Sequence, residues 1–237
     1  MATMNEHTYR QFDSELEAVR SGVLKMGGLV ETQVANAMEG LKSGNIALLD
    51  QVIESDHRIN LLEMQIDEEC NHIIAKRQPT AVDLRLVMTV VKSASDLERI
   101  GDEAKKIAKA AKRLHGGDQP IAPRVELGHS ADIALEMLRG ALDGFARADA
   151  SSLNTIKLQD AEVDANFKGT MRQLITFMME DPRTITNSLD LLFIAKSIER
   201  IGDHAKNIAE FVVFLVQGSD VRYEKSIAKE AARNKES

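Results

Sequence analysis

The sequence predicts an all-α fold made of two tandem, pseudo-symmetric three-helix bundles with six long helices in total. Three observations lead to this prediction. Aromatic residues make up only 4% of the 237 residues and there are only four prolines, too few for a β-sandwich or barrel of this size. Apolar residues recur with helical spacing along most of the chain. Two segments about 100 residues apart repeat each other, which indicates a duplicated unit.

Prolines and glycines separate the expected helices. Pro79 and Pro182 each interrupt one helical half, whereas Pro120 and Pro123 lie in the one stretch that resembles a linker. Gly27-Gly28 indicates either a kink in the first helix or a close helix crossing. The expected helices cover about residues 6–42, 46–77, 80–114, 124–148, 151–180 and 184–217, and residues 218–237 are expected to form only a short or frayed helix.

The repeat relates residues 92–108 to residues 193–209. Ten of these 17 positions are identical at an offset of 101, including a Glu-Arg-Ile-Gly-Asp block in each copy. The simplest interpretation is a three-helix unit that occurs twice, although one continuous six-helix bundle fits the same pattern. We therefore predict a first bundle over residues 1–115, a linker over 116–123, a second bundle over 124–220 and a polar tail over 221–237.

Charge and composition argue against several classes of protein. The formal net charge of −7 provides no overall basic field for nucleic acid. The single Cys70 cannot form an internal disulfide, which fits a reducing compartment. The first 20 residues lack the apolar stretch of a secretory signal, and the apolar run Phe211–Val216 is far shorter than the roughly 20 residues that span a bilayer. We expect a cytoplasmic protein that is not inserted in a membrane but could lie against a membrane protein.

Each copy of the repeat carries two carboxylates one helical turn apart, Glu98 and Asp102 in the first and Glu199 and Asp203 in the second. Like charges at this spacing destabilise a helix by roughly 0.2–0.5 kcal/mol unless a cation neutralises them. Carboxylates on adjacent turns can chelate Mg²⁺, Mn²⁺, Fe or Zn²⁺. Helical geometry places them beside the apolar stripe, on an accessible flank, with Gly101 turned toward the core.

The preceding helix of each half offers further acids. Asp160 and Asp164 share the same spacing, whereas the corresponding pair in the first half is Asp56 and the neutral Asn60. If both sites exist, the second site therefore has one more charge than the first. The alternative is that these acids are solvated helix flanks beside basic residues, for which Arg99, Lys105, Arg200 and Lys206 are available.

Three Glu-x-x-His motifs offer a competing metal site, with His57, His72 and His129. Di-iron four-helix bundles use two such motifs that face the core. The first two motifs here share one predicted helix and lie about 22 Å apart along its axis, so they cannot serve one centre. We expect surface or rim positions for these histidines. A metal-dependent, di-iron-like enzyme or a metal-storage protein is the alternative function, and a plain helical scaffold is the third.

The sequence closely resembles the PhoU family of bacterial phosphate transport accessory regulators. The resemblance is carried by Lys76–Met88 and by the segments Asp96–Asp102 and Ser197–Asp203, and it covers nearly the whole chain. Met26–Glu31 and Phe177–Asp181 are also similar to that family. Two Glu-Arg-Ile-Gly-Asp blocks at this spacing are a specific signal, which a single Glu-x-x-x-Asp would not be.

This resemblance implies a fold of two similar three-helix bundles and a non-enzymatic, cytoplasmic role. Members of the family act as negative regulators of the phosphate-starvation response. They are thought to link the phosphate ABC transporter, through its ATPase subunit, to the histidine kinase that senses phosphate. The resemblance therefore implies these two partners and a homodimer, and it implies no organic cofactor.

The resemblance also implies metal sites. Some members bind multinuclear iron or zinc clusters through Glu/Asp-x-x-x-Asp motifs, which correspond here to the pairs at 98/102 and 199/203. Asp160 and Asp164 match the companion acidic motif, and Asp56 matches its first position. Asn60 departs from that motif, which argues against a full cluster in the first half.

Overall fold

The computed structural model describes residues 3–116 and 123–221, with side chains from residue 10 onward. These residues form six α-helices, one short 3-10 helix and no β-strand, which confirms the predicted all-α fold. The elements are α1 (Thr3–Ser43), α2 (Ile46–Arg77), α3 (Ala81–Gly116), α4 (Gly128–Arg147), α5 (Leu153–Glu180), η1 (Pro182–Thr184) and α6 (Ile185–Gln217).

The predicted helix ends differ most from the observed ones at α4, which begins at Gly128 instead of about residue 124. The Glu126 carboxylate accepts hydrogen bonds from the backbone N–H groups of Gly128 at 2.8 Å and His129 at 3.4 Å. Such a side-chain acceptor satisfies donors that have no partner within the helix, and so fixes the helix start there. Residues 117–122 of the predicted linker and 222–237 of the predicted tail lie outside the described residues.

Two turns show why the sequence breaks its helices where it does. Gly44 adopts a φ of 71°, in the left-handed region that glycine tolerates, and ends α1. Asn45 then accepts a hydrogen bond from the Leu48 N–H at 3.1 Å and caps α2. Pro182 occupies the first turn of η1, where its missing N–H costs nothing, and the Asp181 side chain caps that turn.

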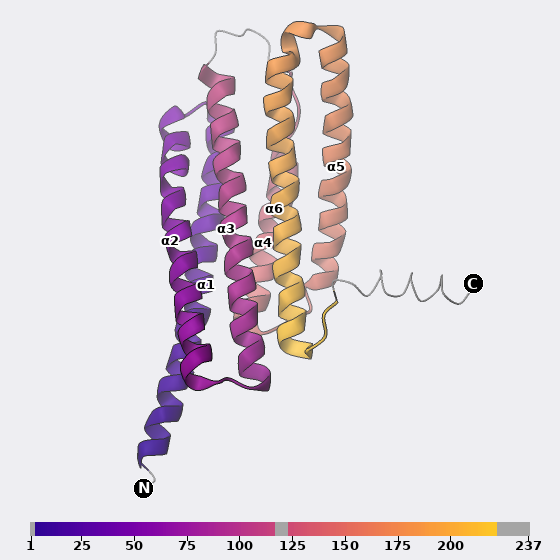
Figure 1. Cartoon of the computed structure of the whole chain (residues 1–237). Coiled ribbons are helices and arrows are strands. Elements are labelled where there is room, and N and C mark those ends of the chain that lie inside the picture. The colour runs from indigo at the N-terminus through magenta and orange to yellow at the C-terminus, as the bar shows by residue number, and fades with distance from the viewer. Residues whose placement is uncertain (1–2, 117–122, 222–237) are drawn as a thin grey trace, which may run out of the picture.

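The helices form two layers (Figure 1). Helices α2, α3, α6 and α5 stand side by side in that order, and α1 and α4 lie behind them. The three helices of each half pack against one another, and α3 makes the most extensive contact of the molecule with α6. These two central helices run antiparallel, because Thr89 near the start of α3 bonds to Phe211 near the end of α6.

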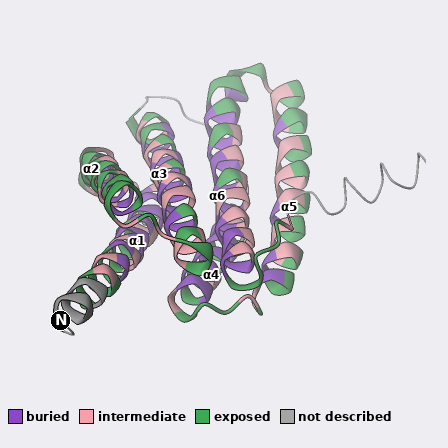
Figure 2. Cartoon of the chain, turned by 60° about the horizontal axis from the view of Figure 1, so that its bottom comes forward, coloured by how far each residue is buried: buried purple, intermediate pink, exposed green. Residues whose placement is uncertain are grey.

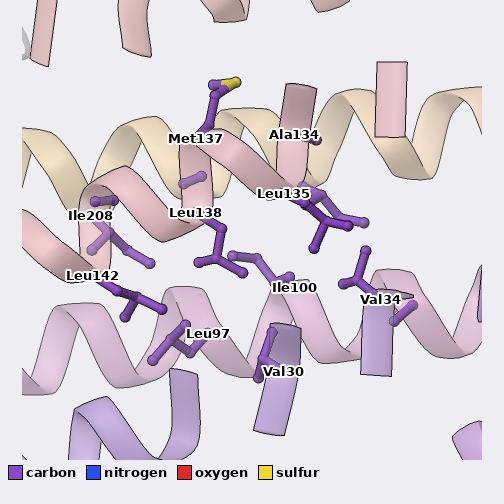
Figure 3. Close-up of a cluster of buried hydrophobic side chains, with 14 of the residues drawn as sticks. Val30, Val34, Leu97, Ile100, Ala134, Leu135, Met137, Leu138, Leu142 and Ile208 are labelled. Atoms are coloured by element: carbon purple, nitrogen blue, oxygen red, sulfur yellow. The ribbon is translucent and has the colours of Figure 1, made fainter. Parts of the chain in front are cut away.

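The halves share one hydrophobic core. Figure 2 shows that the buried surfaces of all six helices turn inward between the two layers. A single cluster of buried apolar residues includes side chains of every helix. In Figure 3 its centre joins both halves through Val30, Val34, Leu97, Ile100, Leu138, Leu142 and Ile208. The two three-helix units are therefore fused through this core and do not meet as separate bodies.

Gly27 explains the close packing of α1 on α4. A Cβ atom at Gly27 would lie 2.6 Å from Cδ2 of Leu142, whereas a Cβ at Gly28 would meet nothing within 4 Å. Helix α1 continues through both residues. The glycine pair thus marks a helix crossing and not a break, which resolves the alternative that the sequence left open.

Two candidate acidic sites

The predicted acids gather along two seams of the four-helix layer. In the first acidic site, Asp56 of α2 faces Glu98 and Asp102 of α3, and the charges of both aspartates act on Glu98. In the second acidic site, Asp160 and Asp164 of α5 lie beside Asp203 of α6. Glu199 lies one turn before Asp203 on the same helix. The structure thus groups the seven predicted residues by half, while metal binding by them stays a prediction.

A lysine already neutralises part of each site. Lys105 Nζ lies 2.6 Å from Asp56 Oδ2 and 3.9 Å from Asp102 Oδ1. In the second half Lys206 Nζ lies 2.6 Å from Asp160 Oδ2 and 2.9 Å from Asp203 Oδ1. The repetition of this arrangement places Lys105 and Lys206 at equivalent positions and shows that the repeat preserves ion pairs as well as acids.

These ion pairs keep the two lysines protonated. The hydrogen bond to Asp56 raises the pKa of Lys105 above its ordinary value. Burial alone would lower the pKa of Lys206, but its hydrogen bonds to Asp160 and Asp203 outweigh burial and raise that pKa. Each lysine therefore offsets the charge of two aspartates across its seam, as the alternative interpretation of these flanks anticipated, whereas neither lysine lies within 4.0 Å of Glu98 or Glu199.

Glu63 and Asp67 of α2 complete the first acidic site, and sequence reasoning missed both. Burial raises the pKa of Glu63, and the neighbouring charges of Glu98 and Asp67 raise it further. Asp56, Asn60, Glu63 and Asp67 follow one another at spacings of three or four residues, which places them on one face of the helix. This spacing along one helix face is the sequence feature that could have identified Glu63 and Asp67.

With Glu63 and Asp67 included, the first site has more carboxylates than the second, which is opposite to the order expected from the predicted residues alone. At the positions equivalent to Glu63 and Asp67, the second half has Phe167 and Met171. Neither of these two positions adds a carboxylate to the four predicted ones of the second site, whereas the first site with Glu63 and Asp67 has five. The expected extra charge of the second site rests on Asp164 against Asn60 and holds for the predicted residues, and adding Glu63 and Asp67 to the first site reverses the count.

Unpaired oxygens in the first site test whether it suits a cation. Asp56 is 3% exposed, and its Oδ1 has no hydrogen-bond partner among the described residues. The same holds for the buried Oδ1 atoms of Asn60 and Asp67, whereas no atom of the second site is buried without a partner in that part of the chain. Carboxylate and amide oxygens are the ligands that hard cations prefer, so the donor set of the first site fits such an ion.

The side chains do not converge in advance. Among residues whose side chains the structure describes, no three His, Cys, Asp or Glu groups lie close enough together to hold a metal ion. Binding would therefore require some of these side chains, such as the long glutamates, to turn toward one another. The first site thus suits a cation by the chemistry of its ligand atoms and by its unpaired oxygens, but its side chains do not form a cation-binding cage in advance.

The three Glu-x-x-His motifs do not form a buried centre. His57, His72 and His129 are all exposed. His129 contacts Glu162 of α5 at 3.1 Å, while the carboxylate of its own motif caps α4. This placement confirms the expected surface positions and gives no support to a di-iron centre in the described bundle.

Two hollows in the described part of the chain lie apart from the acids of both sites. One, of about 320 Å³, lies between α1 and α2 and is lined by Glu15, Ala18, Gln65, Glu68, Glu69, His72 and Ile73. The other, of about 10 Å³, borders the second site only through Phe167. Asp102 and Asp203 have side chains that are 43% and 47% exposed. These two aspartates thus lie on open helix flanks, as expected of a docking surface, whereas Asp56, Asp160 and Glu199 are largely buried in the seams between helices.

None of the described helices is both long and apolar enough to cross a membrane. This agrees with the short apolar runs in the sequence. The central helices are amphipathic, with charged residues along their outer faces.

Comparison with known proteins gives one consistent family. A model described as the PhoU domain matches residues 23–111 and again residues 127–212. A protein of Pseudomonas putida, the phosphate-specific transport system accessory protein PhoU homolog, is 48% identical over 93% of this chain and 86% of its own length.

Solved structures agree with that match. The crystal structure of PhoU from Pseudomonas aeruginosa superposes with a TM-score of 0.84 at 48% identity, covering 88% of this chain and all of the other. The phosphate transport system regulatory protein PhoU from Streptococcus pneumoniae gives a TM-score of 0.81 at 31% identity, covering 89% and 99% of the two chains. The relatives are named as accessory or regulatory proteins and not as enzymes.

Proposed function

The chain belongs to the PhoU family, and from this premise we propose that it is a negative regulator of phosphate uptake and of the phosphate-starvation regulon. The observation that carries the proposal is the 48% identity to an accessory protein of the phosphate-specific transport system over 93% of this chain. The regulatory role named for the Streptococcus pneumoniae protein supports the same reading, at a TM-score of 0.81.

The proposed mechanism is that of an adaptor in the cytoplasm. The protein, as a homodimer, links the ATPase subunit of the phosphate ABC transporter to the phosphate-sensing histidine kinase. The half-exposed charged flanks of α3 and α6 support this role, because charged surfaces favour reversible and partner-specific docking. Helices α3 and α6 stand side by side in one layer, so a partner that lies across both of them contacts both halves (Figure 1).

Cation binding at the acidic helix flanks is the second part of the proposal. The donors are carboxylate and amide oxygens, which suit Mg²⁺ or Mn²⁺, with iron or zinc as the metals that the family resemblance adds. A bound cation would neutralise carboxylates that otherwise repel one another. It regulates docking only if it binds the docked and free states with different affinity, since equal affinity shifts no equilibrium.

Co-purification tests the adaptor role. Membranes from cells that hold the transporter and the kinase are incubated with the purified protein, and membranes lacking the transporter ATPase serve as the control. We expect retention on the first membranes and a clear loss on the second. Equal retention on both, or on neither, would contradict the adaptor role. Light scattering of the same preparation measures the proposed homodimer.

Metal analysis tests the second part independently. Protein purified without chelator is compared with the variant Glu98→Gln/Asp102→Asn/Glu199→Gln/Asp203→Asn, which removes the predicted pair of each half while keeping its size. Elemental analysis should show metal in the wild type and a loss in the variant. Equal metal content would remove the metal part and leave the regulatory part standing.

A further inference from the structure

Basic residues form a row along one side of α3. They recur every seven residues, which is close to two helical turns, so neighbours in the row stand on the same side of the helix about 10.5 Å apart. The row consists of Arg85, Lys92, Arg99, Lys106 and Arg113. The last three of them are exposed and the first two are partly buried. We call these five residues the basic row.

Contacts with α6 place the basic row at the seam between the two central helices. Nearer the start of α3, the Nζ atom of Lys92 lies 5.5 and 5.6 Å from the ring centres of Phe211 and Phe214. Near the end of α3, the Nε–H group of Arg113 donates to Asp190 Oδ1 at 2.9 Å. Because α1 and α4 cover this seam from behind, the exposed side chains of the row face outward, away from those two helices (Figure 1).

The acids that pair with this row are buried beneath it. Lys106 Nζ lies 2.9 Å from Glu103 Oε1, and the lysine side chain is 56% exposed whereas that of Glu103 is 4% exposed. Arg200 of α6 reaches the same Glu103 oxygen at 3.7 Å and is itself exposed. Asp190, which holds Arg113, is buried as well. A partner at this seam therefore meets cations first, although the chain as a whole has a net charge of −7.

The second half shows that the fold does not require a basic row. At an offset of 101 residues, the equivalent positions of α6 are Thr186, Phe193, Arg200, Asn207 and Phe214. Only one of these five residues is basic, although α6 packs in the same layer and contributes to the same core. The other four cations of the row are thus specific to α3, which points to a ligand and not to helix packing as their role.

An exposed aromatic residue lies beside the row. Phe193 of α6 is 60% exposed, and Leu189 one turn before it is also exposed. Phe193 is equivalent to Lys92, whose side chain reaches across to the neighbouring central helix, so the repeat places Phe193 toward the turn of α3 that holds Arg113. Aromatic residues next to basic groups are typical of the centre of a protein interface, where an apolar side chain of the partner packs.

The two acidic sites limit the width of what can bind here. They lie on the α2–α3 and α5–α6 seams, one on either side of the central pair of helices, and Asp102 and Asp203 are half-exposed there. The outer layer thus has a basic midline between two acidic edges. A broad anionic surface such as a bilayer would bring its charges against both edges, whereas a single helix, about 10 Å wide, contacts the midline alone.

We propose that the basic row and Phe193 form the docking site for an acidic amphipathic helix of a protein partner. This helix lies along the α3–α6 seam, with carboxylates toward the basic row and an apolar side chain against Phe193. The seven-residue spacing of the row suits such a ligand, because residues seven apart on the partner helix also share one side. The inference rests on the adaptor role of the proposed function, and it names the surface and the chemistry of the partner.

Retention on membranes that hold the transporter and the kinase tests the docking site. The variant Arg99→Glu/Lys106→Glu reverses two exposed charges of the row. The matched control Lys25→Glu/Lys42→Glu reverses two exposed lysines of α1 and changes the net charge equally. We expect the row variant to need an about tenfold or higher concentration for half-maximal retention, and the control to match the wild type. Added salt should weaken retention of the wild type, because it screens these charges.

A second pair of variants tests the apolar part of the site without changing any charge. Phe193→Ala removes the exposed ring, and Leu29→Ala removes an exposed apolar side chain of α1 as the control. We expect about tenfold weaker retention for Phe193→Ala, as loss of an aromatic anchor gives at other interfaces, and no change for the control. Far-UV circular dichroism and urea unfolding confirm that all four variants are folded.

Carbodiimide cross-linking tests the chemistry of the partner. The reagent condenses a lysine amine with a carboxylate in contact to form an amide, and the carboxylate oxygen that is lost leaves with the reagent as a urea. Mass spectrometry of the retained complex should locate cross-links between Lys92 or Lys106 and acidic residues of the transporter ATPase or the kinase. Cross-links to these proteins from Lys25 or Lys42 instead would contradict the docking site.

Other results would also overturn the inference. Equal retention of the wild type, Arg99→Glu/Lys106→Glu and Phe193→Ala would contradict the docking site and leave the adaptor role standing. The same holds if Lys25→Glu/Lys42→Glu loses retention as much as the row variant does. Binding to protein-free vesicles of phosphatidylglycerol and phosphatidylethanolamine that the row variant loses would identify a lipid surface as the ligand. Absence of wild-type retention on any of the membranes would overturn the adaptor role together with this inference.

Discussion

Glu98 and Glu199 occupy equivalent positions but differ in their partners, which predicts opposite effects of neutralising them. Glu98 is repelled by Asp102 one turn away, whereas Glu199 is paired with Lys196 at 2.5 Å. In the presence of chelator at pH 7, Glu98→Gln should raise the free energy of unfolding by about 0.2–0.5 kcal/mol. Glu199→Gln should give no gain, because it removes an ion pair. Urea unfolding measures both, and equal gains would contradict the assigned partners.

The raised pKa of Glu98 also predicts a pH dependence. Burial is its largest cause, followed by the charges of Asp102 and Asp56. Between the ordinary pKa of 4.5 and the raised one, the folded chain binds more protons than the unfolded chain, so stability falls as pH rises through this range.

The variant Glu98→Gln removes this contribution. Its stability advantage over the wild type should therefore shrink as the pH is lowered from 7 toward 4.5. Urea unfolding in chelator at a series of pH values checks this. An advantage that is constant or grows in acid would contradict the raised pKa.

Some residues of the two acidic sites could be predicted from the sequence, for physical reasons. The i,i+4 spacing places two carboxylates on one helix flank whatever the tertiary fold, so the pairs at 98/102 and 199/203 could be found. Glu63 and Asp67 were missed because they have no acidic counterparts in the second half, where Phe167 and Met171 stand, and the repeat guided the search. The bond of Lys105 to Asp56 depends on how α2 faces α3, which spacing along one helix does not give.

At the scale of elements, the crossing of α1 and α4 gives a prediction with an internal control. Replacing a glycine by alanine inside a helix stabilises that helix by about 1 kcal/mol. Gly27→Ala and Gly28→Ala share this gain, so it cancels when the free energies of unfolding of the two variants are compared. Only at Gly27 does the new methyl group press on Leu142, at 2.6 Å. Gly27→Ala should therefore be less stable than Gly28→Ala by about 1–3 kcal/mol. Chemical denaturation of both variants gives the difference, and equal stabilities would show that the crossing is looser than described.

The elements themselves were largely predictable, and their arrangement was not. Helical periodicity, Gly44-Asn45 and Pro182 determine where helices begin and end through local chemistry, which the sequence displays directly. The start of α4 was missed by about four residues because the capping acceptor is Glu126, a residue type that is uncommon at such a position. An amphipathic pattern shows which face is buried but not which helix covers it, so the order α2, α3, α6, α5 came only from the structure.

For the whole molecule, the shared core predicts that both halves unfold together. Buried residues from every helix form one cluster, and the buried Asp96 contacts the partly buried His204 at 2.6 Å and so joins α3 to α6. Unfolding of one half would expose the apolar face of the other half, so both halves unfold in one cooperative transition. Scanning calorimetry should show one transition with equal calorimetric and van't Hoff enthalpies. Two separate transitions would indicate that the halves are independent domains.

The packing of α3 against α6 in the shared core also has a consequence for the proposed regulation. The first acidic site lies on the α2–α3 seam and the second on the α5–α6 seam, and α3 packs directly against α6 between them (Figure 1). A partner that contacts both central helices would therefore sense the first site while binding the second.

The measurement that tests the central claim most directly is a reporter of phosphate-starvation gene expression in cells whose own copy of this gene is deleted. In phosphate-rich medium we predict high reporter activity in the deletion strain and restored repression when the wild-type chain is supplied. A phosphate-starved wild-type culture provides the reference for full expression. A reporter that stays repressed after the deletion, or that the wild-type chain fails to repress again, would contradict the proposal that this protein is a negative regulator.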